Sequence, residues 1–232
     1  MDCRNRASHP LPVQPLSQIK GFEKDKLTVC TLLFEGETAE VAFHEKQIYE
    51  IAARHGGLNA GGENGKRGYL LTFVIAYLRD IAFDYKYMAE SFETSCPFSC
   101  VENLCRNVKD KIIEVCKEEG VEGEPYSSCR VTQLYDTGVC CYFYFGFLIN
   151  GLPDPMAMFH KLEVAARQEC IDNGGSISHH HGVGKVRKQW LDETVSTTGV
   201  GMMKAVKEKV DPKNIFGVNN LYDHNHAAGG SH

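Results

Sequence analysis

The stretch YSSCRVTQLYDTGVCCYFYFGFLI, residues 126–149, contains the clearest strand pattern in the chain. Two runs rich in β-branched and aromatic residues occupy positions 126–135 and 139–149. The three residues between them, DTG at 136–138, are of the types that form tight turns. The sequence therefore predicts an antiparallel hairpin, and this hairpin sets the fold class.

Helical patterns lie on both sides of the hairpin. Residues 100–119 have amphipathic spacing and stop at Gly120, and a second helix is expected at 156–173 with Pro155 at its start. The other expected elements, in chain order, are a strand at 27–34, a helix at 37–55, a loop at 61–68, a helix at 69–85, a strand at 88–94 and a helix at 193–210.

This order of elements predicts an α+β fold, in which helices pack on an antiparallel sheet. The sequence has no repeated strand–helix–strand unit of the kind that builds a parallel sheet. We expect one domain at residues 21–221, preceded by an unmatched tail at 1–20 and followed by a polar tail at 222–232.

The composition is that of an ordinary folded protein, with 43% hydrophobic and 24% charged residues among 232. A net charge of −5 and the lack of a basic run argue against nucleic acid as a partner. No apolar run reaches the roughly 18–20 residues needed to span a bilayer. Peripheral contact with a membrane surface remains open.

The ten cysteines do not follow the paired CxxC spacings that hold zinc. Several of them, including Cys140 and Cys141, fall inside apolar segments, where a free thiol behaves as a small buried hydrophobic group. We therefore predict reduced, packing cysteines and no metal site.

The strongest local signal for a functional site is GGSISHHHGVGK at residues 174–185. Successive residues of an extended segment point to opposite sides, so His179, His180 and His181 cannot all face a core. Histidines carry protons or bind metals near neutral pH, and flanking glycines let a flat ligand approach the backbone. The alternatives at this point are a polar surface loop and an adventitious metal site.

Two further signals are an aromatic strand and an arginine. Alternation along YFYF, residues 142–145, places Tyr142 and Tyr144 on one face, where a phenol could donate a proton, although aromatic strands are usually core. Arg79 could bind a phosphate together with hydroxyl side chains of residues 91–95, SFETS, although surface arginines on helices are common.

Taken together, these segments resemble those of alkyldihydroxyacetonephosphate synthases. The likeness covers roughly residues 21–221, and its motifs are NGKRGYLLTFVIAYLRD (64–80), ESFETS (90–95), CRVTQLYDTG (129–138), YFYF (142–145), GGSISHHHGVGK (174–185) and RKQW (187–190). The HGxG element at 181–184 and the segment DPKNIFG at 211–217 also resemble the wider superfamily of flavin-linked oxidases.

The resemblance implies an alkylglycerone-phosphate synthase, a transferase of ether lipid synthesis. Such an enzyme exchanges the acyl chain of acyl-dihydroxyacetonephosphate for a long-chain fatty alcohol, and its cofactor FAD does no net redox work. By the same resemblance, Tyr142 matches the acid/base tyrosine, His179, His180 and His181 match an essential histidine cluster, and Arg79 matches the arginine that binds the substrate phosphate. A peroxisomal location rests on the resemblance alone, and a homodimer is a further expectation.

The sequence departs from the family pattern before residue 21. The flavin-binding domain of the family precedes the matched region, whereas this chain has no GxGxxG turn to hold a pyrophosphate. We therefore expect a fragment that is inactive by itself, with cofactor-binding residues that the sequence does not identify. The alternatives are a domain of a flavin-linked 2-hydroxy-acid dehydrogenase, which shares HGxG, and a non-catalytic interaction module.

Overall fold

The computed structural model describes residues 27–221, which divide into two compact units with the boundary between Leu78 and Arg79. The expected tails at 1–20 and 222–232 lie outside the described residues, so the domain limits at 21 and 221 stay a prediction. None of the helices within 27–221 combines the length and the apolar character that crossing a membrane requires.

The amino-terminal unit consists mainly of helix. Helix α2 spans Thr38–Arg54, and helix α3, Gly62–Asp84, continues past the boundary into the second unit. Gly57 follows α2, and its backbone N–H donates to the Ala52 carbonyl, which satisfies one of the last free carbonyls of the helix. The helix predicted at 37–55 is thereby confirmed.

Two predictions in this unit are wrong. Residues 27–34 form no strand, and their backbone has no regular structure, because within the described range no other chain segment pairs with them. The expected loop at 61–68 is helical from Gly62 onward. Its glycines weaken a helix, but each residue added to an existing helix gains a hydrogen bond without a new nucleation cost.

The second unit is built on a three-stranded antiparallel sheet with the order β1-β3-β2. Strand β1 spans Tyr87–Pro97, β2 spans Tyr126–Leu134 and β3 spans Gly138–Leu148. The hairpin β2–β3 is the one that the sequence predicts, with a bulge between Val131 and Gln133. From β1 the chain passes through a helix to β2, and β3 then runs between β2 and β1 as the central strand.

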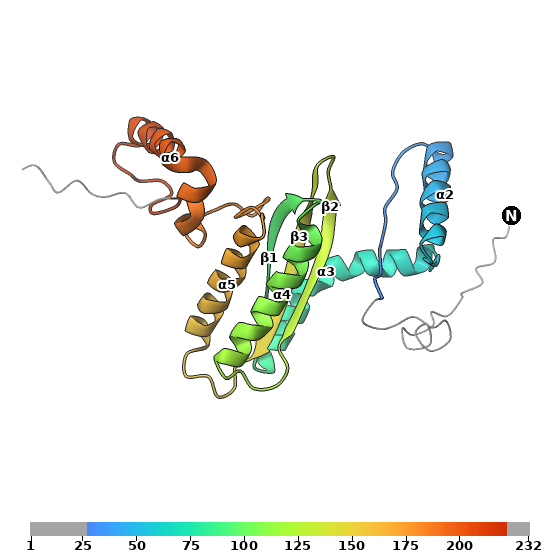
Figure 1. Cartoon of the computed structure of the whole chain (residues 1–232), viewed down its shortest axis with the longest axis horizontal. Helices are drawn as coiled ribbons and strands as arrows, with labels where there is room; N and C mark the ends of the chain where they lie inside the picture. The colour runs from blue at the N-terminus through green and yellow to red at the C-terminus, as the bar shows by residue number, and fades with distance from the viewer. Residues whose placement is uncertain (1–26, 222–232) are drawn as a thin grey trace, which may run out of the picture. The chain divides into compact units, whose positions relative to one another are not determined.

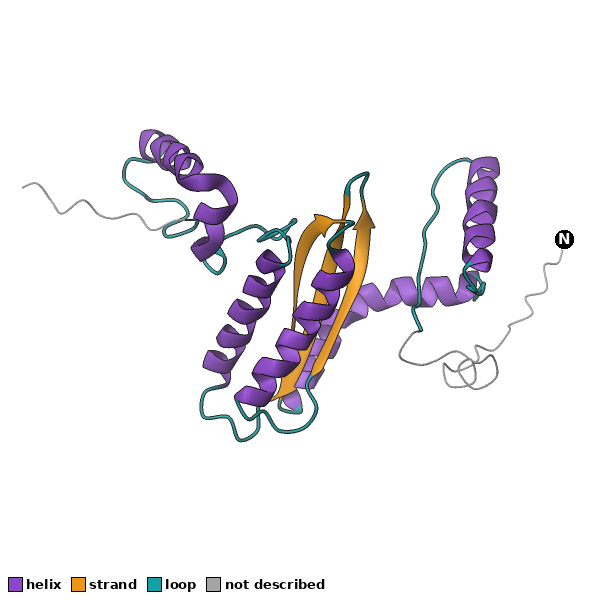
Figure 2. Cartoon of the chain, viewed as in Figure 1, coloured by secondary structure: helices purple, strands orange, loops and turns teal. Residues whose placement is uncertain are grey.

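Helices α4, Val101–Glu118, and α5, Pro155–Asp172, lie side by side over one face of the sheet (Figures 1 and 2). Asp154 caps α5, since its carboxylate accepts from the backbone N–H groups of Met156 and Ala157. The main core fills the space between these helices and the sheet, and its fully buried members include Phe143, Phe145, Phe147, Leu104, Val108, Ile112, Leu162 and Ala166. The predicted α+β class, with helices packed on an antiparallel sheet, is confirmed.

A smaller apolar cluster lies beyond α5. A short 3₁₀ helix, Lys188–Trp190, leads into α6, Leu191–Val210, and Trp190 is buried with Ile177, Leu191 and Val200. The backbone of α6 is interrupted at Ser196, which has a φ of 67°. The helix predicted at 193–210 is thus present, and it begins two residues earlier than expected.

Candidate active site

The histidine loop, residues 174–185, begins where α5 ends and is attached to the open edge of β1. The backbone N–H of Ser176 donates to the Ser95 carbonyl at 2.9 Å, and Thr94 Oγ1 donates to the Ser176 carbonyl at 2.6 Å. A Cβ on Gly175 would lie within 3.0 Å of Thr94 Oγ1 and of Leu104. The loop therefore contacts the sheet at a position where only glycine fits. This contact fixes the position of the segment that leads to the three histidines.

Glu93 on β1 organises the loop from below. Its side chain is fully buried, and its carboxylate accepts from the Ser178 hydroxyl at 2.7 Å, from the backbone N–H of His181 at 3.0 Å and from the backbone N–H of His179. Burial by itself would favour the neutral acid, but the hydrogen bonds from Ser178, His179 and His181 stabilise the anion and lower the pKa of Glu93 to about 2. A buried carboxylate is therefore charged at neutral pH directly beneath the histidines.

Tyr142 meets this loop from the central strand. Glu93 and Tyr142 are directly opposite each other on β1 and β3, so their side chains emerge on the same face of the sheet. The Tyr142 hydroxyl lies 2.7 Å from His181 Nε2, and His181 Nδ1 lies 3.7 Å from Glu93 Oε1. Phenol, imidazole and carboxylate thus form a continuous series, and the carboxylate favours the His181 tautomer with its hydrogen on Nδ1.

Burial sets the protonation of this series. It raises the pKa of Tyr142, with a smaller contribution from Tyr144, so the phenol stays protonated at neutral pH. Burial also lowers the pKa of His181, against the attraction of the Glu93 carboxylate. A neutral imidazole whose Nε2 accepts from a neutral phenol is consequently the resting state.

The other two histidines form a second hydrogen-bonded series with Tyr135. The Tyr135 hydroxyl donates to Gln133 Oε1 at 2.8 Å and lies 2.8 Å from His179 Nε2, while His179 Nδ1 lies 2.9 Å from His180 Nδ1. Since Tyr135 has one hydrogen and Gln133 receives it, His179 Nε2 donates and its Nδ1 accepts from His180. His180 Nε2 is then free of hydrogen and can accept a hydrogen bond. The ring centroids of His180 and His181 lie 4.5 Å apart.

The structure brings four of the predicted residues together and leaves one apart. Tyr142, His179, His180 and His181 share one face of the sheet, whereas Arg79 forms an ion pair with Glu90 at 3.4 Å. The hydroxyl groups expected beside Arg79 have other roles, because those of Thr94 and Ser95 contact Ser176 of the histidine loop.

Three residues of the site were missed in the sequence: Glu93, Tyr135 and Arg187. The Arg187 side chain donates to the Gly182 carbonyl at 2.5 Å and lies 3.9 Å from Glu93 Oε1, so it holds the far end of the loop. Only Glu93 gave a usable signal, since a carboxylate that becomes buried within a strand needs partners.

Comparisons with known proteins identify relatives of this chain. The chain is 48% identical over 204 residues to the alkyldihydroxyacetonephosphate synthase of Caenorhabditis elegans, covering 88% of this chain and 34% of that protein. It is 26% identical over 200 residues to the synthase of Dictyostelium discoideum, covering 86% of this chain and 32% of that protein. The chain therefore spans about a third of the length of these relatives, and the predicted resemblance to their family is confirmed.

Solved structures support the fold. An alkyldihydroxyacetonephosphate synthase structure matches 79% of this chain with a TM-score of 0.57 and 21% sequence identity, over 30% of its own length. The family described as FAD linked oxidases, C-terminal domain, matches residues 5–219, so the match begins inside the segment expected to be an unmatched tail. The chain belongs to this family of FAD linked oxidase C-terminal domains.

Proposed function

We propose that this chain forms the substrate-facing domain of an alkylglycerone-phosphate synthase, which exchanges the acyl chain of acyl-dihydroxyacetonephosphate for a long-chain fatty alcohol. One observation carries the proposal: the series from the Tyr142 phenol through His181 to the buried Glu93 carboxylate. The names of the relatives support the reaction class. A non-catalytic module would have no need of a buried anion that orients an imidazole toward a phenol.

The series can move one proton at the carbon beside the substrate carbonyl. The phenol oxygen of Tyr142 takes the proton from that carbon while its own hydrogen passes to His181 Nε2. The imidazolium that forms is stabilised by the Glu93 carboxylate, which is already charged. The reverse transfer returns the proton, so the residues end the cycle in the protonation states in which they began.

The described residues fit one side of a flavin. FAD, when bound, supplies the reactive ring that holds the substrate carbon during the exchange, without net redox change. The rings of Tyr142, His180 and His181 form a wall for such a group. Gly182 and Gly184 have open space where a side chain would begin, so a flat ring can approach their backbone. We assign the binding of the pyrophosphate to a region outside residues 27–221.

Arg79 is proposed to bind the phosphate of the substrate. Its guanidinium is half exposed, and it is paired with an exposed carboxylate, Glu90, that a dianionic phosphate could displace. A peroxisomal location is proposed on the family resemblance alone, and fluorescence microscopy of the tagged full-length protein would test it.

A chimaeric enzyme tests the proposal. Residues 27–221 of this chain replace the matching third of the Caenorhabditis elegans synthase, and incorporation of a labelled fatty alcohol into the ether product is measured. The chimaera should be active, and Tyr142→Phe should reduce exchange by about 100-fold or more, the usual range for a general acid/base. The visible spectrum of the bound flavin reports whether the variant keeps its fold.

Tyr144→Phe is the matched control. Tyr144 lies on the same face and stacks on Tyr142 with ring centroids 5.5 Å apart, but its hydroxyl is hydrogen-bonded to Arg130, whereas the Tyr142 hydroxyl lies beside His181. It should keep most of the exchange activity. Normal exchange by Tyr142→Phe would remove this phenol from the mechanism, and oxidation of a 2-hydroxy acid with a dye acceptor, without exchange, would favour the dehydrogenase alternative.

A separate measurement tests the chain by itself. We expect purified chain, mixed with FAD, to show no bound-flavin spectrum and no exchange, because the pyrophosphate has no site within residues 27–221. Stable flavin binding by the chain alone would contradict this division of roles.

A further inference from the structure

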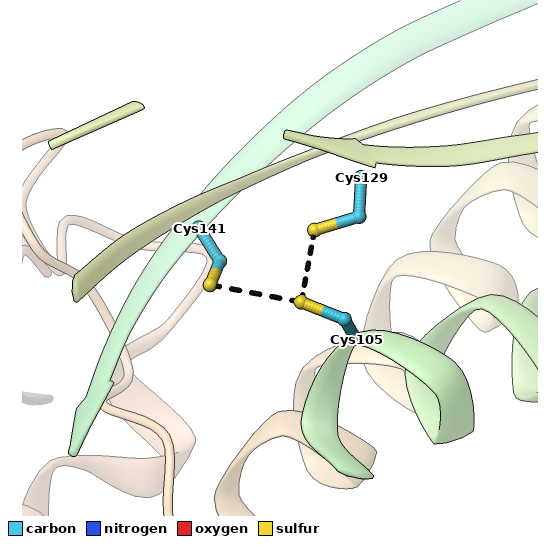
Figure 3. Close-up of side chains that lie close together, drawn as sticks. All are labelled: Cys105, Cys129 and Cys141. Atoms are coloured by element: carbon cyan, nitrogen blue, oxygen red, sulfur yellow. Dashed lines mark hydrogen bonds between the residues drawn. The ribbon is translucent and has the colours of Figure 1, made fainter. Parts of the chain in front are cut away.

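Three cysteines that are distant in sequence meet between the sheet and helix α4. Cys105 comes from α4, Cys129 from β2 and Cys141 from β3, and their sulfur atoms point toward one another (Figure 3). The Sγ atom of Cys105 lies 3.2 Å from that of Cys129 and 3.8 Å from that of Cys141, and all three lie within 4.8 Å of one another. This thiol cluster lies on the face of the sheet away from Tyr142 and the histidines.

The spacing of the sulfurs is suitable for a shared metal ion. Three sulfurs around a metal with bonds of about 2.3 Å lie about 4 Å apart when the site is planar. The 3.8 Å separation between Cys105 and Cys141 is near this value, whereas the 3.2 Å separation between Cys105 and Cys129 would have to widen by about 0.8 Å on binding. Structural zinc sites have four ligands, whereas among the described residues this cluster gathers only three.

We propose that Cys105, Cys129 and Cys141 form a three-coordinate thiolate site for a soft monovalent metal ion of the copper(I) class. Thiolates select soft metals, and a low coordination number disfavours zinc relative to copper(I). Binding replaces thiol hydrogens, which leave as protons to the solvent. The site is separate from the proposed exchange reaction and does not depend on it.

A cation lies near the thiol cluster. Lys109 lies one turn along α4 from Cys105, and its charge acts on both Cys105 and Cys129. A positive charge beside the cluster offsets part of the negative charge that several thiolates bring.

The cluster departs from the expectation of packing thiols without a metal. That expectation considered spacing along the chain, whereas the three ligands come from three elements separated by 24 and 12 residues in sequence. The fold brings them together, because Cys129 and Cys141 lie on adjacent strands and α4 crosses above both.

Metal transfer to the whole chain tests the proposal. Reduced chain is titrated with copper(I) supplied as its complex with bicinchoninate, and transfer is followed by the loss of colour of that complex. We expect one copper(I) per chain and three sulfur neighbours by X-ray absorption. In the wild-type chain, copper(I) should also protect Cys105, Cys129 and Cys141 from alkylation, as mapped by peptide mass spectrometry, and this readout needs no variant.

Variants locate the site. Cys105→Ala and Cys129→Ala should each weaken copper(I) binding by more than about 100-fold, beyond the usual cost of losing an outer partner of a metal ligand. Cys116→Ala is the matched control, because Cys116 is a buried thiol on the same helix outside the cluster, and it should bind copper(I) normally.

Each other result overturns the proposal. If copper(I) protected other cysteines from alkylation, the metal site would lie elsewhere. If the chain bound zinc more tightly than copper(I), with four ligands around the zinc ion, the site would be a zinc site. The third result is a disulfide. Mild peroxide would then lower the intact mass by two hydrogens and join Cys105 to Cys129, and the reduced chain would take up no copper(I).

Discussion

The two faces of strand β3 have different roles. On one face, Val139, Cys141, Phe143, Phe145 and Phe147 are at most 2% exposed and pack under α4 and α5. On the other face, Tyr142 and Tyr144 are only partly buried and meet Arg130 and the histidine loop. Because side chains alternate along a strand, neighbouring residues in YFYF can serve stability and chemistry separately. Substitutions at adjacent positions should therefore have different consequences.

The faces also differ in how their polar groups are held. The covered face buries thiols and phenylalanine rings, and Phe92 stacks on Phe143 with ring centroids 5.1 Å apart. The loop-facing side buries a charge, Glu93, and holds it with three hydrogen bonds. An apolar core tolerates small shape changes better than a buried anion tolerates the loss of a donor.

The largest expected effect is on the covered face. Phe143→Ala should lower the free energy of unfolding by about 3–5 kcal/mol, because it removes a fully buried ring between the sheet and the helices. Urea unfolding followed by circular dichroism measures this change. A loss below about 1 kcal/mol would mean that the core rearranges around the cavity, and the contrast between the faces would then be weaker than the burial indicates.

The sequence was sufficient to predict the elements of this sheet and the face of its tyrosines. Local signals were strong there: the DTG turn, the alternation through YFYF, and proline and glycine at the ends of α5. Local signals gave the wrong prediction for residues 27–34, a β-rich segment with no described strand to pair with. They also gave the wrong prediction for residues 61–68, where the adjoining helix extends through the glycines. In both cases the neighbours of the segment, and not its composition, decided the outcome.

The site could be predicted only as far as its residues lie close in sequence. The sequence singled out the three histidines and Tyr142, because each belongs to a distinctive motif, and the structure brings them together. The role of Glu93 was not found, since it depends on donors from a loop more than 80 residues later. The meeting of Cys105, Cys129 and Cys141 depends in the same way on the crossing of α4 over the sheet.

The second effect is on Glu93 and depends on pH. Its pKa is lowered from 4.5 to about 2 in the folded protein, so its charge stabilises the fold above about pH 4.5, and this contribution is lost as the pH falls toward 2. Glu93→Gln should therefore lower the free energy of unfolding at pH 7 by an amount on the order of 3 kcal/mol. The difference from the wild type should shrink between pH 4.5 and 2 in urea titrations.

Glu90→Gln is the control for that experiment. Glu90 lies on the same strand, but its side chain is 37% exposed and pairs with Arg79. It should change stability by less than about 1 kcal/mol and show little dependence on pH. If both variants behave alike, the charge of Glu93 is not what holds the histidine loop.

The third effect is at Tyr142 and should be small for stability. Tyr142→Phe removes one hydrogen bond, to His181, at a cost of about 1 kcal/mol, while the ring keeps its contacts. Thermal unfolding of the variant and of Tyr144→Phe should give melting temperatures within a few degrees of the wild type. A large destabilisation would place Tyr142 among the core residues, contrary to the division between the faces.

The smallest expected effect on stability, at Arg79, is the one that tests the comparison most sharply. Glu90, the ion-pair partner of Arg79, lies directly opposite Phe145, so its side chain starts from the face that the helices cover. Both charges are exposed, and Arg79→Gln should change the free energy of unfolding by less than about 1 kcal/mol.

In the chimaera, the same Arg79→Gln variant should raise the KM for acyl-dihydroxyacetonephosphate while the flavin spectrum stays unchanged, because a fixed cation for the phosphate is lost. An unchanged KM would restrict the proposed chemistry to the side of the sheet that carries Tyr142, whereas a raised KM would mean that the substrate extends past the edge of β1 toward the covered face.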